Sequence, residues 1–173
     1  ASKARAPMPP EAAPRSFAAP PAALGTPLKR LETLGAKVTY RGRVMPADCQ
    51  ANGILDDRGY IARFTDAGPH AWAEAGLHHD FLAENNLGRV AVEMKLTIGQ
   101  DLSAGALVHV LTAFTAVGRS TFSMRHHIVD TRQGHIAAIG ELTVLILDLK
   151  ARRSVPLPVS ARERLAERVI SES

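Results

Sequence analysis

The sequence predicts one α+β domain in which an antiparallel sheet packs against a single long helix. Three observations support this prediction: a helical stretch that begins near Asp56, four strand-like runs after it, and turn residues between those runs. Consecutive strands with short connections are expected to pair antiparallel, and the one long helix is available to cover the sheet. A chain of 173 residues is long enough to bury its own core.

The first half of the pattern is a strand followed by the helix. Apolar residues alternate with polar ones across residues 37–44, which predicts a half-buried strand. Asp56 is expected to cap the helix, and Gly68-Pro69 is expected to kink or interrupt it. The predicted buried face of this helix repeats at spacings of three and four residues and consists of Tyr60, Phe64, Ala67, Ala71 and Ala75.

The second half reads as sheet, followed by a short helix. The clearest alternation predicts one face of Val90, Val92, Met94, Leu96 and Ile98, opposite a face of Ala91, Glu93, Lys95 and Thr97. Further strands are predicted near 107–117, 121–129 and 136–149. Ser160 and Glu163 are expected to form a capping box for the last helix.

Composition limits the classes of function. The single cysteine, Cys49, excludes a disulfide scaffold and favours a reducing compartment, so a cytoplasmic location is expected. No apolar run approaches the roughly 20 residues of a spanning helix, so no membrane partner is expected. A net charge of +4 with 5% aromatic residues argues against a nucleic-acid partner and leaves small anionic ligands open.

Residues 1–28 differ from the rest of the chain. They contain seven of the 11 prolines and one acidic residue, Glu11. Such a composition buries too little apolar surface to offset the entropy of ordering. We therefore expect a disordered arm or linker over 1–28 and one folded domain over 29–173.

Four segments in order resemble the hotdog-fold acyl-CoA thioesterases of the 4-hydroxybenzoyl-CoA thioesterase type. They are YRGRVMPADCQANGILDDRGYIARFTDA (40–67), IGQDLSAGALVHV (98–110), VGRSTFSMRHHIVD (117–130) and LILDLKARRSVPLP (145–158). The resemblance implies a hotdog fold, in which an antiparallel sheet wraps around one long central helix. It also implies hydrolysis of an acyl-CoA to the free acid and CoA by a homodimer or homotetramer with sites between subunits.

The same resemblance implies a set of catalytic residues and one departure. Family members carry an aspartate at the position of Gln50, whose neutral amide can orient a carbonyl or water but cannot act as a base. A second branch of the family pairs a glutamine with a helical carboxylate, and Asp66 resembles that acid. Asp48 is the alternative acid. The backbone N–H of Asp57, at the helix N-terminus, is the expected oxyanion donor.

Basic residues are candidates for the phosphates of CoA, which is expected as part of the substrate and not as a separate cofactor. Guanidinium groups bind phosphate in a bidentate manner, although each could equally be a solvated surface charge. The candidates are Arg119, Arg125, Arg152 and Arg153. No metal is expected, because His126 and His127 are adjacent on a strand and point to opposite faces.

Two alternatives remain open. The first is a catalytically reduced hotdog protein that binds acyl or CoA ligands without hydrolysis, which the glutamine at position 50 favours. The second is a hotdog dehydratase, which the resemblance disfavours because Ile54 stands where a histidine is often found.

Overall fold

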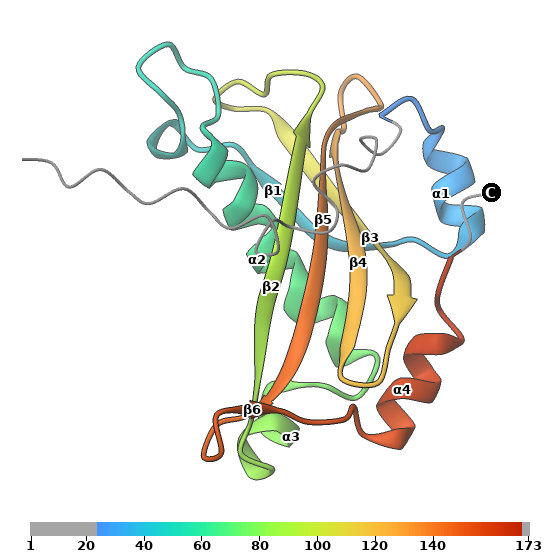
Figure 1. Cartoon of the computed structure of the whole chain (residues 1–173). Coiled ribbons are helices and arrows are strands. Elements are labelled where there is room, and N and C mark those ends of the chain that lie inside the picture. Colours follow the sequence, from blue (N-terminus) through green and yellow to red (C-terminus); the bar gives the residue numbers. More distant parts are fainter. Residues whose placement is uncertain (1–23, 171–173) are drawn as a thin grey trace, which may run out of the picture.

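The computed structural model describes residues 24–170 and confirms the α+β prediction (Figure 1). The helical elements are α1 (Leu28–Leu34), the one-turn 3₁₀ helix η2 (Pro46–Asp48), α2 (Asp57–Ala73), α3 (His79–Glu84) and α4 (Val159–Ala166). The strands are β1 (Lys37–Arg43), β2 (Leu87–Ile98), β3 (Leu107–Val117), β4 (Thr121–Asp130), β5 (His135–Asp148) and β6 (Arg153–Ser154). No helix within residues 24–170 is long and apolar enough to cross a membrane.

The sheet is antiparallel and has the strand order β1-β3-β4-β5-β2, with β6 paired to the end of β5. Figure 1 shows it curling around α2, which crosses behind the strands. We call the face that packs against α2 the inner face and the opposite one the outer face. The helix α1 covers part of the outer face, where Leu31 packs with Leu111 and Ile139.

The predicted arm falls mostly on residues 1–23, which lie outside the described residues. The described remainder is packed against the domain. Leu24 and Leu28 both contact the outer-face cluster, and Leu28 is the first residue of α1.

The helix α2 forms where the sequence predicts it. Asp56 is the N-cap, and its carboxylate accepts a hydrogen bond from the Gly59 N–H at 2.7 Å. Pro69 does not interrupt the helix, which corrects the expectation of a break. The carbonyl that loses its partner to Pro69 belongs to Thr65, which is exposed and can therefore bond to water. Ala75 is buried as expected, but it lies beyond the helix end.

The centre of the inner face is built around the Phe64 ring. Phe64 is 1% exposed and stacks on His126 of β4, with ring centroids 5.4 Å apart. Gly140 of β5 lies directly opposite His126 in the ladder, and a Cβ at position 140 would overlap the Phe64 ring. A glycine at this position therefore lets α2 approach the sheet closely.

A β-bulge in β2 corrects the predicted alternation of that strand. Ala91 pairs with Val144 and Glu93 pairs with Thr143, so Val92 is an extra residue without a partner. Residues paired across an antiparallel ladder share a face. Ala91 therefore shares the inner face with Val144, and Glu93 lies on the outer face with Thr143.

The predicted apolar stripe of β2 is consequently divided between two faces. Met94 pairs with Leu142 on the inner face, whereas Val90 pairs with Leu145 on the outer face. The prediction of a single apolar face is wrong, because periodicity along the sequence does not reveal an inserted residue. The strand is also at the edge of the sheet, and Val90, Val92, Met94 and Ile98 are 37–53% exposed.

Two details of the other helices also differ from expectation. The helix α3 has no counterpart in the prediction, and its N-cap is His78, whose Nδ1 accepts from the Phe81 N–H at 3.2 Å. The helix α4 begins after Pro158 without a side-chain cap. The predicted capping box is therefore wrong, since Ser160 already lies inside the first turn.

Candidate functional site

The N-terminus of α2 presents an open backbone donor. Asp57 is the first residue of the helix, and its N–H has no hydrogen-bond partner within the described part of the chain. The Gly59 N–H is already satisfied by Asp56, whose pKa this hydrogen bond holds below its usual value. The helix end therefore combines one free N–H at Asp57 with the positive end of the helix dipole.

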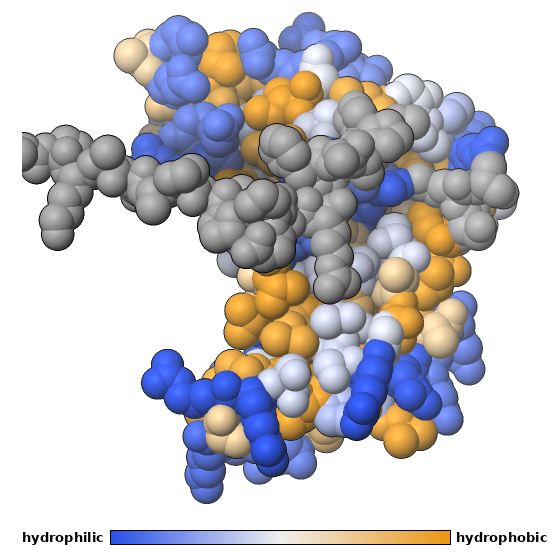
Figure 2. All heavy atoms as spheres, viewed as in Figure 1, coloured by the Kyte–Doolittle hydropathy of each residue, from blue (hydrophilic) through white to orange (hydrophobic). Residues whose placement is uncertain are grey.

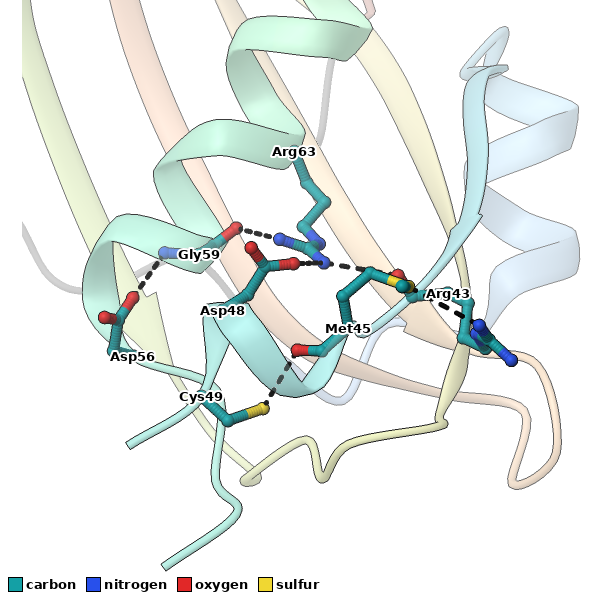
Figure 3. Close-up of polar contacts among 7 residues, drawn as sticks. All are labelled: Arg43, Met45, Asp48, Cys49, Asp56, Gly59 and Arg63. Atoms are coloured by element: carbon teal, nitrogen blue, oxygen red, sulfur yellow. Dashed lines mark hydrogen bonds and ion pairs between the residues drawn. The ribbon is translucent and has the colours of Figure 1, made fainter. Parts of the chain in front are cut away.

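A buried arginine joins three segments beside this helix end (Figure 3). Nη2 of Arg63 donates to Oδ2 of Asp48 at 2.7 Å and to the Arg43 carbonyl at 3.3 Å. Nη1 donates to the Gly59 carbonyl at 2.9 Å. Arg63 is only 4% exposed, and these contacts give both of its Nη groups the partners that a buried cation requires, whereas its buried Nε has none within residues 24–170. They also fix η2, which carries Asp48, against the first two turns of α2.

The contact with Arg63 favours the carboxylate form of Asp48. The hydrogen bond from the guanidinium lowers the pKa of Asp48, and its positive charge acts in the same direction. Asp48 is therefore held as a carboxylate at the start of α2. Of the two acids that the sequence suggests for catalysis, Asp48 is the one that the structure brings to this helix end.

Asp66 lies elsewhere on α2. It is exposed and is nine residues beyond Asp57, which corresponds to about 14 Å along the helix axis. At 100° per residue it lies about 60° around the helix from Arg63 and about 120° from Trp72. Trp72 faces β2 through its contact with Arg89. Asp66 therefore belongs to the exposed flank on the side of Arg63 and not to the flank that faces β2.

Gln50 lies in a tight turn between η2 and α2. Its N–H donates to the Ile54 carbonyl at 2.8 Å, and its carbonyl accepts from the Gly53 N–H at 2.9 Å. Gly53 adopts a positive φ of 79°, which a glycine allows without strain. The Gln50 side chain is exposed and makes no hydrogen bond within residues 24–170.

Cys49, next to Gln50, donates its thiol to the Met45 carbonyl at 3.4 Å (Figure 3). The Cys49 side chain is partly buried against the inner-face cluster around Tyr60. It thus behaves as a small packed residue of the turn.

The four arginines proposed for phosphate binding are not brought together at this helix end. Arg119 lies in the β3–β4 turn and Arg152 in the β5–β6 turn, at the end of the sheet where β6 lies in Figure 1. Figure 2 shows strongly hydrophilic side chains gathered at that end. Arg153 is in β6 itself and pairs with Asp148 in the ladder. Arg125 lies on the outer face, where its Nη2 donates to Oε1 of Glu141 at 3.1 Å.

His126 is fully buried between the sheet and α2. Its Nδ1 lies 2.6 Å from the Thr112 hydroxyl, which in turn lies 2.6 Å from the Thr39 hydroxyl. Desolvation, with a smaller contribution from His127, lowers the pKa of His126 to about 3. His127 lies on the outer face, so the two rings point apart as the alternation predicts. No three His, Cys, Asp or Glu side chains in residues 24–170 are grouped so that they could hold a metal ion.

The sequence reasoning missed Arg63, although a signal was present. Arg63 stands next to Phe64 and four residues before Ala67, within the arc that faces the sheet. A charged residue on such an arc is rarely buried without a partner.

Comparison with known proteins places this geometry in a family. A profile of the Thioesterase-like superfamily matches residues 44–167, which include η2, α2 and the sheet from β2 to β6. No curated protein matches the chain significantly.

Solved structures show the same fold. The hypothetical protein SAV2348 from Staphylococcus aureus, solved in complex with CoA, is 16% identical, with a TM-score of 0.72 over 80% of this chain and 89% of that one. The BH1999 gentisyl-coenzyme A thioesterase is 25% identical, with a TM-score of 0.66 over 75% of this chain and 99% of that one. Slr0204 from Synechocystis, a 1,4-dihydroxy-2-naphthoyl-CoA thioesterase, is 16% identical, with a TM-score of 0.66 over 75% and 96% of the two chains.

These matches confirm the resemblance drawn from the sequence. The family profile covers well over half of the chain, and the related structures share the curled sheet around a central helix. The chain therefore belongs to the thioesterase-like superfamily and has its hotdog fold.

Proposed function

We propose that this protein is an acyl-CoA thioesterase that hydrolyses the thioester to a free acid and CoA. The observation that carries the proposal is the open N–H of Asp57 at the start of α2, beside a carboxylate that Arg63 holds in place. The names of the related structures support the same chemistry, because one that is 25% identical is a coenzyme A thioesterase. The sequence alone supports hydrolysis only through its resemblance to the family.

The proposed reaction uses the two groups in sequence. The thioester carbonyl oxygen accepts the Asp57 N–H, so the charge that develops on it lies at the positive end of the helix. A water oxygen attacks the carbonyl carbon while Asp48 takes one of its protons. When the carbon–sulfur bond breaks, that proton passes to the CoA thiolate. Gln50 orients the water or the carbonyl, because its amide donates and accepts but does not take a proton.

The first experiment measures thiol release from a panel of acyl-CoAs by the wild type, Asp48→Asn and Asp66→Asn. Loss of a general base lowers kcat by about 100-fold to 10,000-fold, and we expect this loss in the Asp48 variant. The Asp66 variant removes the same charge from the exposed flank of the same region and serves as the matched control. Loss of turnover in the Asp66 variant alone would identify Asp66 as the general base and contradict the assignment of Asp48.

The second candidate function is binding of acyl or CoA ligands without hydrolysis. Two observations favour it: Gln50 replaces the acid of the family, and Asp48 is tied to Arg63, which makes it a weaker base. Saturable binding of CoA in calorimetry, with no thiol release from any acyl-CoA, would support this function over the first.

We propose that the active form is a homodimer or homotetramer. The supporting observation is β2, whose 12 residues lie at the free edge of the sheet with exposed apolar side chains on both faces. A second copy that pairs with this edge would cover Met94 and Ile98. Sedimentation of the wild type beside Met94→Glu tests this, since a monomer in both cases contradicts it.

The unpaired Cys49 supports a reducing, cytoplasmic location.

A further inference from the structure

A hollow on the outer face is lined by two arginines and a histidine and contains no acid. It has a volume of about 440 Å³ and lies where β1 and β3 meet the end of β4. Arg41 and Arg43 are two residues apart on β1 and therefore point to the same side. His109 of β3 is directly opposite Arg41 in the ladder. The remaining lining consists of Gly42, Leu107, Val108 and Thr131, all of them uncharged.

The two arginines and the histidine of this hollow have no acidic partners within residues 24–170. Neither Arg41 nor Arg43 nor His109 forms an ion pair within residues 24–170. The nearest side-chain contact of Arg43 is a weak one, from Nη2 to the Met45 sulfur at 3.6 Å.

Three other arginines of the described chain do have acidic partners. Arg63, Arg125 and Arg168 each contact a carboxylate, on Asp48, Glu141 and Glu74 respectively. Two neighbouring guanidinium groups without counter-charges repel each other, so they create a local positive potential that an anionic ligand would relieve.

The hollow adjoins the candidate active site through the backbone. The Arg43 carbonyl accepts the hydrogen bond from Arg63 that also holds Asp48, while Figure 3 shows the Arg43 side chain pointing away from Asp48. A second hollow of about 660 Å³ shares Leu107 and Thr131 with the first. It is also lined by Ser103, which bridges to Ile54 in the turn that precedes α2, and by the acids Asp101 and Asp130 beside Arg132.

We propose that Arg41, Arg43 and His109 bind the phosphate-bearing nucleotide end of the CoA thioester. This inference rests on the proposed function, since it assigns a subsite to the same ligand. Two guanidinium groups and an imidazole offer several charge-assisted hydrogen bonds to phosphate oxygens. The site replaces the earlier candidates Arg119, Arg152 and Arg153, which lie at the opposite end of the sheet from the start of α2.

The test compares three double variants of the full chain. Arg41→Gln/Arg43→Gln removes two charges from the hollow, and Arg152→Gln/Arg153→Gln removes two from the earlier candidate position. Lys150→Gln/Arg162→Gln is the matched control, because both residues are exposed and lie in neither set. All substituted side chains are at the surface, and thermal melts check that each variant is folded.

The first readout is calorimetric binding of CoA and of adenosine bisphosphate, its nucleotide fragment. We expect the Arg41/Arg43 variant to weaken both by about tenfold or more, because two charge-assisted contacts to phosphate are lost. The control should change the Kd by less than about twofold, as expected for distant charges screened by salt. A larger loss in the Arg152/Arg153 variant, or no loss in the Arg41/Arg43 variant, would overturn the proposal.

The second readout separates this inference from the proposed function. For the Arg41/Arg43 variant, the KM of an acyl-CoA should rise, whereas the KM of the same acyl group on pantetheine, which lacks the nucleotide, should not. Hydrolysis with an unchanged KM for acyl-CoA would refute the subsite and leave the thioesterase intact. A wild type that binds adenosine bisphosphate through these arginines without hydrolysing any thioester would refute the activity and leave the subsite intact. A wild type that binds neither CoA nor its fragment would overturn the subsite.

Discussion

Burial of His126 predicts a specific loss of stability as the pH falls from 7 to 5. The ring is 0% exposed and stacked on Phe64, and burial lowers its pKa to about 3. In the unfolded chain the same ring has a pKa of about 6.5. Between these two values the unfolded state binds a proton that the folded state does not bind, so stability decreases as the pH falls.

The magnitude follows from the linkage relation. One proton of difference corresponds to about 1.4 kcal/mol per pH unit, so His126 should cost about 2 kcal/mol of unfolding free energy between about pH 7 and pH 5. The carboxylates with lowered pKa values, such as Asp48 and Glu74, contribute stability that is lost only at lower pH. The window above about pH 5 therefore excludes the carboxylates, and the difference between the wild type and a His126 variant separates His126 from the other histidines.

Urea unfolding at several pH values, with the wild type and His126→Asn side by side, measures this slope. An asparagine amide can keep the hydrogen bond to the Thr112 hydroxyl that Nδ1 makes, but it does not titrate. The variant is expected to be less stable at every pH, because it leaves a cavity beside Phe64, and to lose the part of the slope that His126 contributes. Equal slopes in the two proteins, or a His126 imidazole that titrates near about 6.5 by NMR in the folded state, would refute the reasoning.

Three further substitutions test other contacts. Gly140→Ala should destabilise the fold by about 1–3 kcal/mol, because the new methyl overlaps the Phe64 ring, and an unchanged thermal melt contradicts this packing. Asp56→Ala should lower the unfolding midpoint by a few degrees through loss of the α2 cap, whereas Asp56→Asn should retain most of it. Arg63→Met removes the cause of the low pKa of Asp48, so the acid limb of kcat/KM should move to higher pH if Asp48 is the base. If the acid limb of the pH profile of kcat/KM does not shift in this variant, a group other than Asp48 is the base that titrates.

Most of the fold could be predicted from the sequence because local patterns determine it. The cap at Asp56 and the three-and-four spacing of Tyr60 and Phe64 locate α2, and turn residues separate the strands. The elements that were missed depend on long-range contacts. The helix α3 is only six residues long, and nothing in its sequence sets it apart from a loop.

The candidate site was predicted less well, for a related reason. Gln50, Asp48 and Asp57 are close in sequence, so their common position before α2 follows from local structure. The contact of Arg63 with Asp48 spans 15 residues and depends on how η2 folds back over the helix. Arg41 and His109 are 68 residues apart and become neighbours only through strand pairing. No pattern within one segment contains that information.

The extra residue at Val92 also affects how this chain should be compared with others. A one-residue shift in an alignment at this strand would exchange the set of side chains that faces α2 with the set that faces outward. Residues 93–98 of this protein should therefore be matched to relatives by the face that each side chain occupies. An alignment that ignores the extra residue would equate Met94, which lies on the inner face, with a residue that faces outward in a relative.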